Sequence, residues 1–145
     1  MFAAYELAVN PDIQDRLRGE IKALSGKDLS YEAIVEMKYL DQFVTEVLRK
    51  WPVSPSIERI CVRDCTLDID GKSVTILKDQ NVLVPAYAWH RDPNNFPNPE
   101  RFDPSRFDEE NIKLQNMNAY APFGIGPRSC IGSRFALMAV KTILC

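Results

Sequence analysis

The chain has 145 residues, 46% of them hydrophobic, and a formal net charge of −2 at neutral pH. That apolar content can build one hydrophobic core, and the near-balanced charge without a dense basic run argues against nucleic-acid binding. The four cysteines make no Cys-x-x-Cys pair and there is one histidine, so a structural zinc site is not expected. Nothing in the sequence marks secretion, and no apolar run is long enough to span a membrane, so we expect reduced thiols facing the cytosol.

Apolar residues at helical spacing predict several helices in the first part of the chain. The predicted helices cover residues 1–9, 11–24, 31–36 and 37–51. Asn10 is a suitable N-cap for the second of them, and Ser25-Gly26 is a suitable end. Ser30 can cap the third helix, and Pro52 stops the fourth because proline cannot continue a helix.

Short apolar runs between turn residues predict strands in the middle of the chain. The predicted strands cover residues 57–62, 66–69, 72–77 and 82–84. Asp70-Gly71 is a typical hairpin turn, and Pro85 ends the last strand. His90 is the only histidine, and we expect it to have a structural role near Asp92 rather than a catalytic one. Residues 94–120 are rich in Pro, Asn and Asp and lack periodicity, which predicts a long coil.

A glycine-rich turn, residues 123–132, places one cysteine directly before an apolar helix. Gly126 permits a tight bend with positive φ, and Arg128 supplies a fixed charge and a planar set of donors. Cys130 lies where the first free N–H groups of the helix point, which favours its thiolate, and Gly132 leaves room for a flat ligand. A rigid thiolate beside a cation suits an iron porphyrin with acidic propionates. For this cysteine alone, a buried thiol at a loop–helix junction is the alternative interpretation.

Five residues of this turn follow the pattern Phe-x-x-Gly-x-Arg-x-Cys-x-Gly, namely Phe123, Gly126, Arg128, Cys130 and Gly132. The pattern resembles the haem-binding signature of the cytochrome P-450 family of haem-thiolate monooxygenases. Two further motifs occur in the order that the family has: Glu46-x-x-Arg49 on the long helix, and Pro99-Glu100-Arg101-Phe102 in the coil. The resemblance spans nearly the whole chain and looks closest to microsomal insect members that metabolise xenobiotics.

The resemblance implies a mainly α fold with small β-sheets, as in the C-terminal part of the cytochrome P-450 fold. Its parts are the end of the long central helix, two or three further helices, short β-hairpins, a meander, the cysteine-ligand loop and a proximal helix. Residues 1–145 are expected to be one partial domain, truncated at both ends. In the proximal helix, an apolar stripe is typical of ordinary core packing, although its position also allows haem contact. The stripe consists of Ile131, Phe135, Met138, Ala139, Thr142 and Ile143.

The resemblance also implies roles for single residues. Cys130 is expected to be the axial ligand of the haem iron. The residues expected to bind the haem are Phe123, Gly126, Arg128, Gly132 and Arg59. The residues expected on the substrate side are Val53, Ser54, Pro55 and Ser56. Glu46, Arg49 and Arg101 are expected to form a buried cluster that fixes the coil. The alternative for Glu46 and Arg49 is an exposed ion pair, and the alternative for Arg59 is a solvated arginine at a strand edge. For Val53 to Ser56 the alternative is an ordinary helix–strand linker.

The family's chemistry implies a monooxygenase that inserts one oxygen atom of O₂ into an apolar small molecule, with heme b (iron protoporphyrin IX) as cofactor. Electrons would come from NADPH through a flavoprotein, NADPH–cytochrome reductase, which Lys141 or Arg134 could meet. The resemblance places the protein at the cytosolic face of the endoplasmic reticulum membrane, through a missing N-terminal anchor.

No catalytic residue is expected within the chain itself. In the family, an acid–alcohol pair delivers protons to bound oxygen, and that pair would precede Met1. An oxygen-independent haem-thiolate isomerase or dehydratase would share most of the motifs found here. A non-catalytic truncated product is a further alternative, and the 145 residues alone are expected to hold haem poorly.

Overall fold

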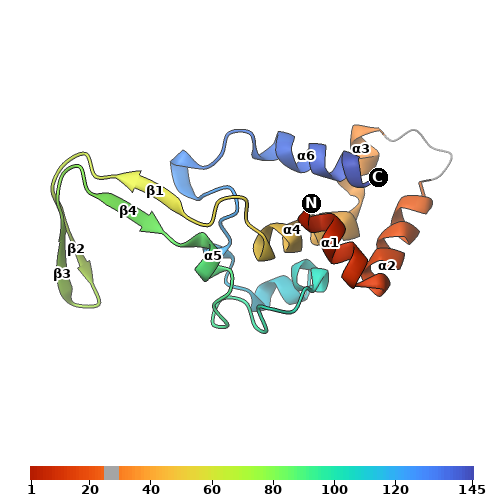
Figure 1. Ribbon diagram of the computed structural model, residues 1–145, viewed down its shortest axis with the longest axis horizontal. Coiled ribbons are helices and arrows are strands. Elements are labelled where there is room, and N and C mark those ends of the chain that lie inside the picture. The colour runs from red at the N-terminus through yellow and green to blue at the C-terminus, as the bar shows by residue number, and fades with distance from the viewer. Residues whose placement is uncertain (25–29) are drawn as a thin grey trace.

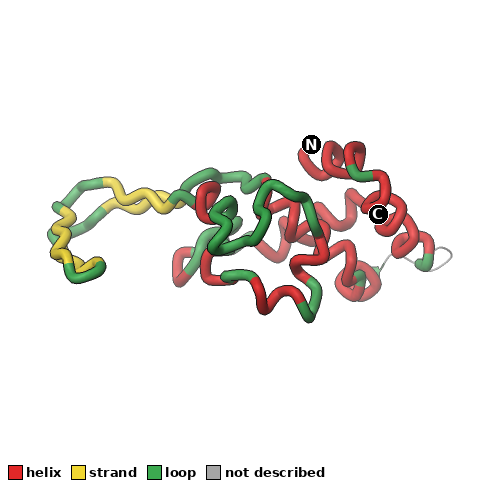
Figure 2. Tube along the Cα trace, turned by 90° about the horizontal axis from the view of Figure 1, so that it is seen from below, coloured by secondary structure: helices red, strands yellow, loops and turns green. Residues whose placement is uncertain are grey.

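The helices form a body at one end of the molecule, and two β-ribbons extend away from it (Figures 1 and 2). The structure is a computed structural model that describes residues 1–24 and 30–145. Its helices are α1 (Phe2–Val9), α2 (Pro11–Lys22), α3 (Tyr31–Glu36), α4 (Lys38–Lys50), α5 (Ala86–Trp89) and α6 (Ser133–Leu144). The predicted helix end at Ser25-Gly26 lies outside the described residues. The mainly α class with small antiparallel sheets is confirmed.

The hydrophobic core forms around α4. Leu40 and Phe43 are fully buried on the inner stripe of this helix, and Ile13 and Leu17 of α2 pack against the same cluster. Phe102, from the coil, completes the cluster with its ring edge-on to Phe43 at a centroid distance of 5.6 Å. The helical spacing of apolar residues therefore identified the core face of both helices correctly.

The helix starts differ from the predictions in one case. Ser30 Oγ accepts a hydrogen bond from the Ala33 N–H at 3.2 Å, so Ser30 caps α3 as predicted. Asn10 does not cap α2 with its side chain, because its amide Nδ2 donates to Glu6 O at 2.8 Å instead. The N-terminus of α4 is capped by Glu20 of helix α2. The two carboxylate oxygens of Glu20 accept the Tyr39 and Leu40 N–H groups, each at 2.8 Å.

The strands form two separate antiparallel pairs, β1 with β4 and β2 with β3. They are β1 (Ile57–Ile60), β2 (Cys65–Ile69), β3 (Lys72–Ile76) and β4 (Asn81–Val84). Asp70 and Gly71 have φ angles of 52° and 76°, as a tight hairpin turn with two left-handed residues requires. The predicted hairpin is therefore confirmed. The first strand ends earlier than Val62, because its pairing with β4 ends at Ile60, opposite Asn81.

The coil of residues 94–120 is held by short 3₁₀ turns and by aromatic side chains. The turns are Pro104–Phe107, Asn111–Leu114 and Met117–Ala119. Phe96 is fully buried, and Phe107 packs against the Tyr120 ring at a centroid distance of 5.5 Å. Within residues 1–24 and 30–145, none of the helices has the length and apolar character needed to cross a bilayer.

Candidate functional site

A cavity of about 520 Å³ lies between the turn that carries Cys130, the strand β1 and the linker that follows α4. Three of the predicted haem contacts, Phe123, Arg128 and Arg59, line this cavity together with Cys130. Three of the predicted substrate-side residues also line it, and these are Val53, Ser54 and Ser56. Segments more than sixty residues apart in the sequence thus meet around one thiol.

The turn before α6 is closed by backbone hydrogen bonds. The Cys130 N–H donates to Phe123 O at 2.8 Å, so the chain returns on itself between these two residues. Gly124 and Gly126 have φ angles of 77° and 74°, in the left-handed region that glycine adopts without strain. The positive φ predicted at Gly126 is therefore confirmed, and the turn fixes the position from which the Cys130 side chain projects.

The thiol of Cys130 is exposed and free. Helix α6 begins at Ser133, with Gly132 as its N-cap, so the cysteine lies just before the helix. The expectation that the free N–H groups of the helix favour the Cys130 thiolate stays a prediction. A Cβ atom at Gly132 would lie 3.9 Å from Cys130 Sγ, which is an ordinary van der Waals contact.

Two arginines bring positive charge to the cavity from different elements. Arg128 belongs to the short 3₁₀ turn Gly126–Arg128, and Arg59 belongs to β1. One guanidinium nitrogen of Arg59, Nη1, donates to Glu58 O at 2.8 Å, which leaves its other donors free for an anion. Gly126, Gly132 and Pro55 of the predicted set are not among the residues that line this cavity.

The apolar stripe of the proximal helix, which runs from Ile131 into α6, packs only in part. Ile131, Phe135 and Ile143 are 104%, 80% and 83% exposed. The helix instead packs through Leu137 and Leu144, which lie against the core cluster. Met138 and Ala139 of the same stripe are half-buried, so within the described residues ordinary core packing accounts for only part of the stripe, and its Cys130 end remains open to a ligand.

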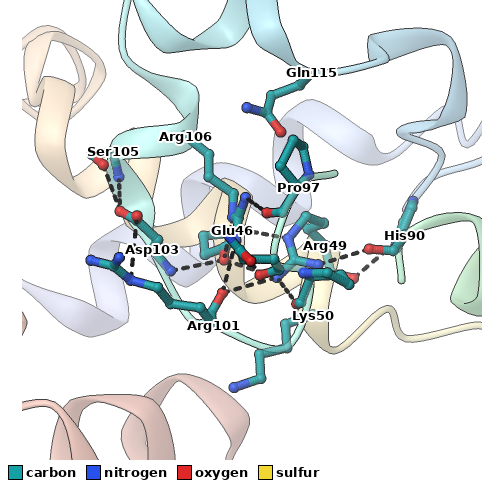
Figure 3. Close-up of polar contacts among 12 residues, drawn as sticks. Glu46, Arg49, Lys50, His90, Pro97, Arg101, Asp103, Ser105, Arg106 and Gln115 are labelled. Carbon is teal, nitrogen blue, oxygen red and sulfur yellow. Dashed lines mark hydrogen bonds and ion pairs between the residues drawn. The ribbon is translucent and has the colours of Figure 1, made fainter. Parts of the chain in front are cut away.

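Glu46 and Arg49 form the buried ion pair that the sequence predicted (Figure 3). Both side chains are 0% exposed, and the Arg49 Nε and Nη2 atoms lie 2.6 and 2.9 Å from the two Glu46 carboxylate oxygens. Arg49 also donates to His90 O and Pro99 O, each at 2.7 Å. The carboxylate accepts the Asp103 N–H at 2.9 Å. Because Pro99 and Asp103 belong to the coil, the pair fixes the coil to α4, and the bond to His90 O ties in the end of α5.

The third member of this cluster is Arg106, and the prediction of Arg101 was wrong. The Arg101 side chain is 74% exposed and lies 3.7 Å from Asp103, whereas Arg106 is 7% exposed with its Nε 3.4 Å from Glu46 Oε1. Arg106 also donates to Pro97 O (Figure 3). A second bond runs from Arg106 to Asn98 O. Arg101 contributes only its backbone carbonyl, which accepts from Arg106 Nη2 at 3.2 Å.

The sequence contained a second candidate arginine, in a repeat of the same pattern, that the prediction did not consider. Pro104-Ser105-Arg106-Phe107 repeats the Pro-x-Arg-Phe pattern of Pro99-Glu100-Arg101-Phe102 after five residues. Asn98 has a positive φ of 50°, which turns the chain just before the first copy. The two copies consequently present their arginines to different surroundings, and only the second copy reaches Glu46.

His90 links this cluster to the cysteine turn. The ring is 0% exposed, its Nε2 accepts the Ala121 N–H at 2.9 Å, and its Nδ1 lies 3.0 Å from Arg49 O. Nδ1 therefore carries the proton of a neutral imidazole and donates it to Arg49 O. The structural role predicted for His90 is confirmed, but its partners are Arg49 and Ala121 rather than Asp92. Ala121 begins the segment that leads to Cys130.

We expect the stability of the chain to fall as the pH drops from 6.5 to 4. Burial lowers the pKa of His90 from 6.5 to about 4, so in this range the unfolded chain binds a proton that the folded chain does not. The loss reaches roughly 3 kcal/mol at the low end. Urea unfolding at several pH values measures it, and His90→Gln is the control because it removes the titrating group. Equal pH slopes for the two chains in this range would contradict the assignment.

The model of the family "Cytochrome P450" matches residues 1–145. "Probable cytochrome P450 9f2" of Drosophila melanogaster is 48% identical over 147 residues, which cover 99% of this chain and 28% of that protein. "Cytochrome P450 6k1" of Blattella germanica is 46% identical over 147 residues, with the same two coverages of 99% and 28%. The chain thus spans 28% of the length of these curated relatives. The chain belongs to the cytochrome P450 family, a family of haem proteins.

Proposed function

We propose that this chain is the haem-binding part of a haem-thiolate monooxygenase, with Cys130 as the axial ligand of a heme b iron. One observation carries the proposal: a cavity of about 520 Å³ is lined by a free, exposed thiol and by two arginines from separate elements. A thiol can bind the iron, and two guanidinium groups match the two propionates of heme b. The residues present therefore fit the cofactor.

Each part of the site has a role that its position supports. When haem is bound, thiolate ligation supplies electron density that favours O–O cleavage. The closed turn from Phe123 to Cys130 holds the sulfur, so the ligand does not need to be ordered when the cofactor binds. Arg128 and Arg59 would hold the propionates of the haem through charge-assisted hydrogen bonds. Phe123 adds an apolar wall to the cavity.

The linker after α4 supports an apolar substrate. Val53 is 87% exposed in this structure and lines the same cavity as Cys130, and Ser54 and Ser56 lie beside it. Exposed apolar surface in a cavity is the usual character of a small-molecule site. We therefore infer that the linker faces an apolar small molecule that receives one oxygen atom from O₂. Pro55 does not line the cavity. Its carbonyl accepts a hydrogen bond from the Tyr87 N–H at 2.9 Å.

We infer an NADPH–cytochrome reductase as electron donor and the cytosolic face of the endoplasmic reticulum membrane as location, as the resemblance to microsomal insect members implies. The structure changes which cation can meet an acidic reductase surface. Lys141 is 8% exposed, and its Nζ is 2.6 Å from Asp41 Oδ1, so its charge is paired in a salt bridge within the chain. Arg134 is exposed on the same helix and remains the candidate.

The proposal predicts that loss of either cavity arginine weakens haem retention roughly tenfold, the cost of one hydrogen bond to a charged group. The test uses a chimera in which these 145 residues replace the matching segment of the full-length Drosophila relative. Haem transfer from the chimera to an excess of apomyoglobin measures the affinity of Arg59→Leu and Arg128→Leu. Arg134→Leu, also an exposed arginine but outside the cavity, is the matched control. Equal haem loss from all three variants would contradict the proposal.

A further inference from the structure

Two of the four cysteines meet at the corner between the two β-ribbons. Cys61 directly follows β1, Cys65 is the first residue of β2, and their sulfur atoms are 3.9 Å apart. Both residues are half-buried, so solvent and small reagents reach the pair. This corner lies far from α6 in Figure 1, where the ribbons extend away from the helices. Neither Cys61 nor Cys65 lines the cavity of the Cys130 site.

Backbone hydrogen bonds hold both sides of this corner. The Cys61 N–H donates to Gln80 O at 2.9 Å, and Cys61 O accepts the Asp79 N–H at 2.7 Å. On the other side, Cys65 is paired with Ile76 in the β2–β3 ladder. The two thiols are thus anchored by different ribbons, and their proximity is set by the fold rather than by the loop alone.

Among the described residues, neither of the other two cysteines lies beside a second cysteine. Cys130 and Cys145 flank α6, a helix of 12 residues that is about 18 Å long. Cys145 Sγ contacts Met37 Sδ at 3.8 Å instead. Cys61 with Cys65 is therefore the pair that the fold prepares for a bond within the chain.

We propose that Cys61 and Cys65 form a reversible thiol–disulfide modification site, oxidised by a low-molecular-weight disulfide such as glutathione disulfide. The thiolate of one cysteine attacks a sulfur of glutathione disulfide, forming a mixed disulfide and releasing one glutathione thiolate. The second cysteine thiolate then attacks the protein sulfur of the mixed disulfide and releases the second glutathione. Two protein thiols are oxidised and one glutathione disulfide is reduced, and the two protons that the protein thiols lose are taken up by the two released glutathione thiolates.

The geometry makes the second step faster than the same attack by a thiol that is not held next to the mixed disulfide. The sulfur atoms need to approach from 3.9 Å to about 2.0 Å. Rotation of the side chains and small adjustment of residues 62–64 between them can supply that approach, because these residues are exposed. The resulting disulfide ties the end of β1 to the start of β2, two residues after Arg59 of the cavity.

The test equilibrates the 145-residue chain with glutathione buffers of increasing disulfide fraction at alkaline pH. Alkaline pH is chosen because the hydrogen bond to Cys61 and burial raise the pKa of Cys65. Acid quenching, alkylation and mass spectrometry then count internal disulfides and mixed disulfides at each cysteine. We expect Cys61–Cys65 to be the internal disulfide that forms. Its equilibrium constant should be about tenfold larger in buffer than in concentrated urea, because the fold holds the two thiols together.

Cys145→Ser is the control that leaves the expected disulfide unchanged, and Cys61→Ser should convert Cys65 to a mixed disulfide only. Two results overturn the proposal. One is glutathione on Cys61 and Cys65 separately without an internal bond at any buffer ratio. The other is an equal equilibrium constant in buffer and in urea, which would mean that the folded corner does not favour the bond.

Discussion

Replacing Arg106 with alanine is expected to lower the free energy of unfolding of the chain by about 3–5 kcal/mol. The reason is that Arg106 is 7% exposed and supports a Glu46 carboxylate that is 0% exposed, so its removal leaves buried carbonyls and a buried charge short of a partner. The same change at Arg101, which is 74% exposed, is expected to leave the stability nearly unchanged. The two arginines lie in the same sequence pattern, which makes the pair a matched comparison.

Urea unfolding followed by circular dichroism measures both variants. The expected loss is a large share of the stability of an ordinary domain, which is enough to unfold the Arg106→Ala variant even without urea. Arg106→Lys then supplies the comparison, since it keeps the charge but loses the planar set of donors, and it should fall between the native chain and the alanine variant. A larger loss for Arg101→Ala than for Arg106→Ala would restore the original assignment and contradict the geometry.

The Glu46–Arg49 pair shows what the sequence could and could not predict. Spacing on a helix put the two side chains on one face, and that part was confirmed. Spacing does not reveal burial, which here depends on carbonyl groups of His90 and Pro99 that arrive from more than forty residues away. The choice between Arg101 and Arg106 failed for a related reason. A coil without periodicity has no predictable inner face, so sequence pattern alone did not show which arginine turns inward.

The strands and α6 show the same limit in another form. The turn residues predicted the β2–β3 hairpin because a hairpin is local, whereas the pairing of β1 with β4 joins strands that lie on either side of that hairpin. In α6, the spacing predicted an apolar stripe correctly but not what covers it. Phe135 on that stripe is 80% exposed among the described residues, while Leu137 and Leu144 pack on the core. Periodicity identifies a face and leaves its partner open.

Replacing Cys130 with alanine is expected to abolish thiolate ligation of the haem in the chimera with the full-length Drosophila relative. The reason is that Cys130 is the one cysteine among those lining the cavity with Arg59 and Arg128. Alanine removes the sulfur but leaves the backbone hydrogen bond from residue 130 to Phe123 O available, so the turn should persist. Cys145→Ala is the control, because that thiol lies beside Met37 and away from the cavity.

The absorption spectrum of the reduced, carbon monoxide-bound chimera tests the bond between Cys130 and iron most directly. The native chimera and the Cys145→Ala variant should both show the band typical of thiolate-ligated haem, and the Cys130→Ala variant should lack it at equal haem content. Survival of the thiolate band in the Cys130→Ala variant would show that another sulfur holds the iron, and the site described here would then be wrong.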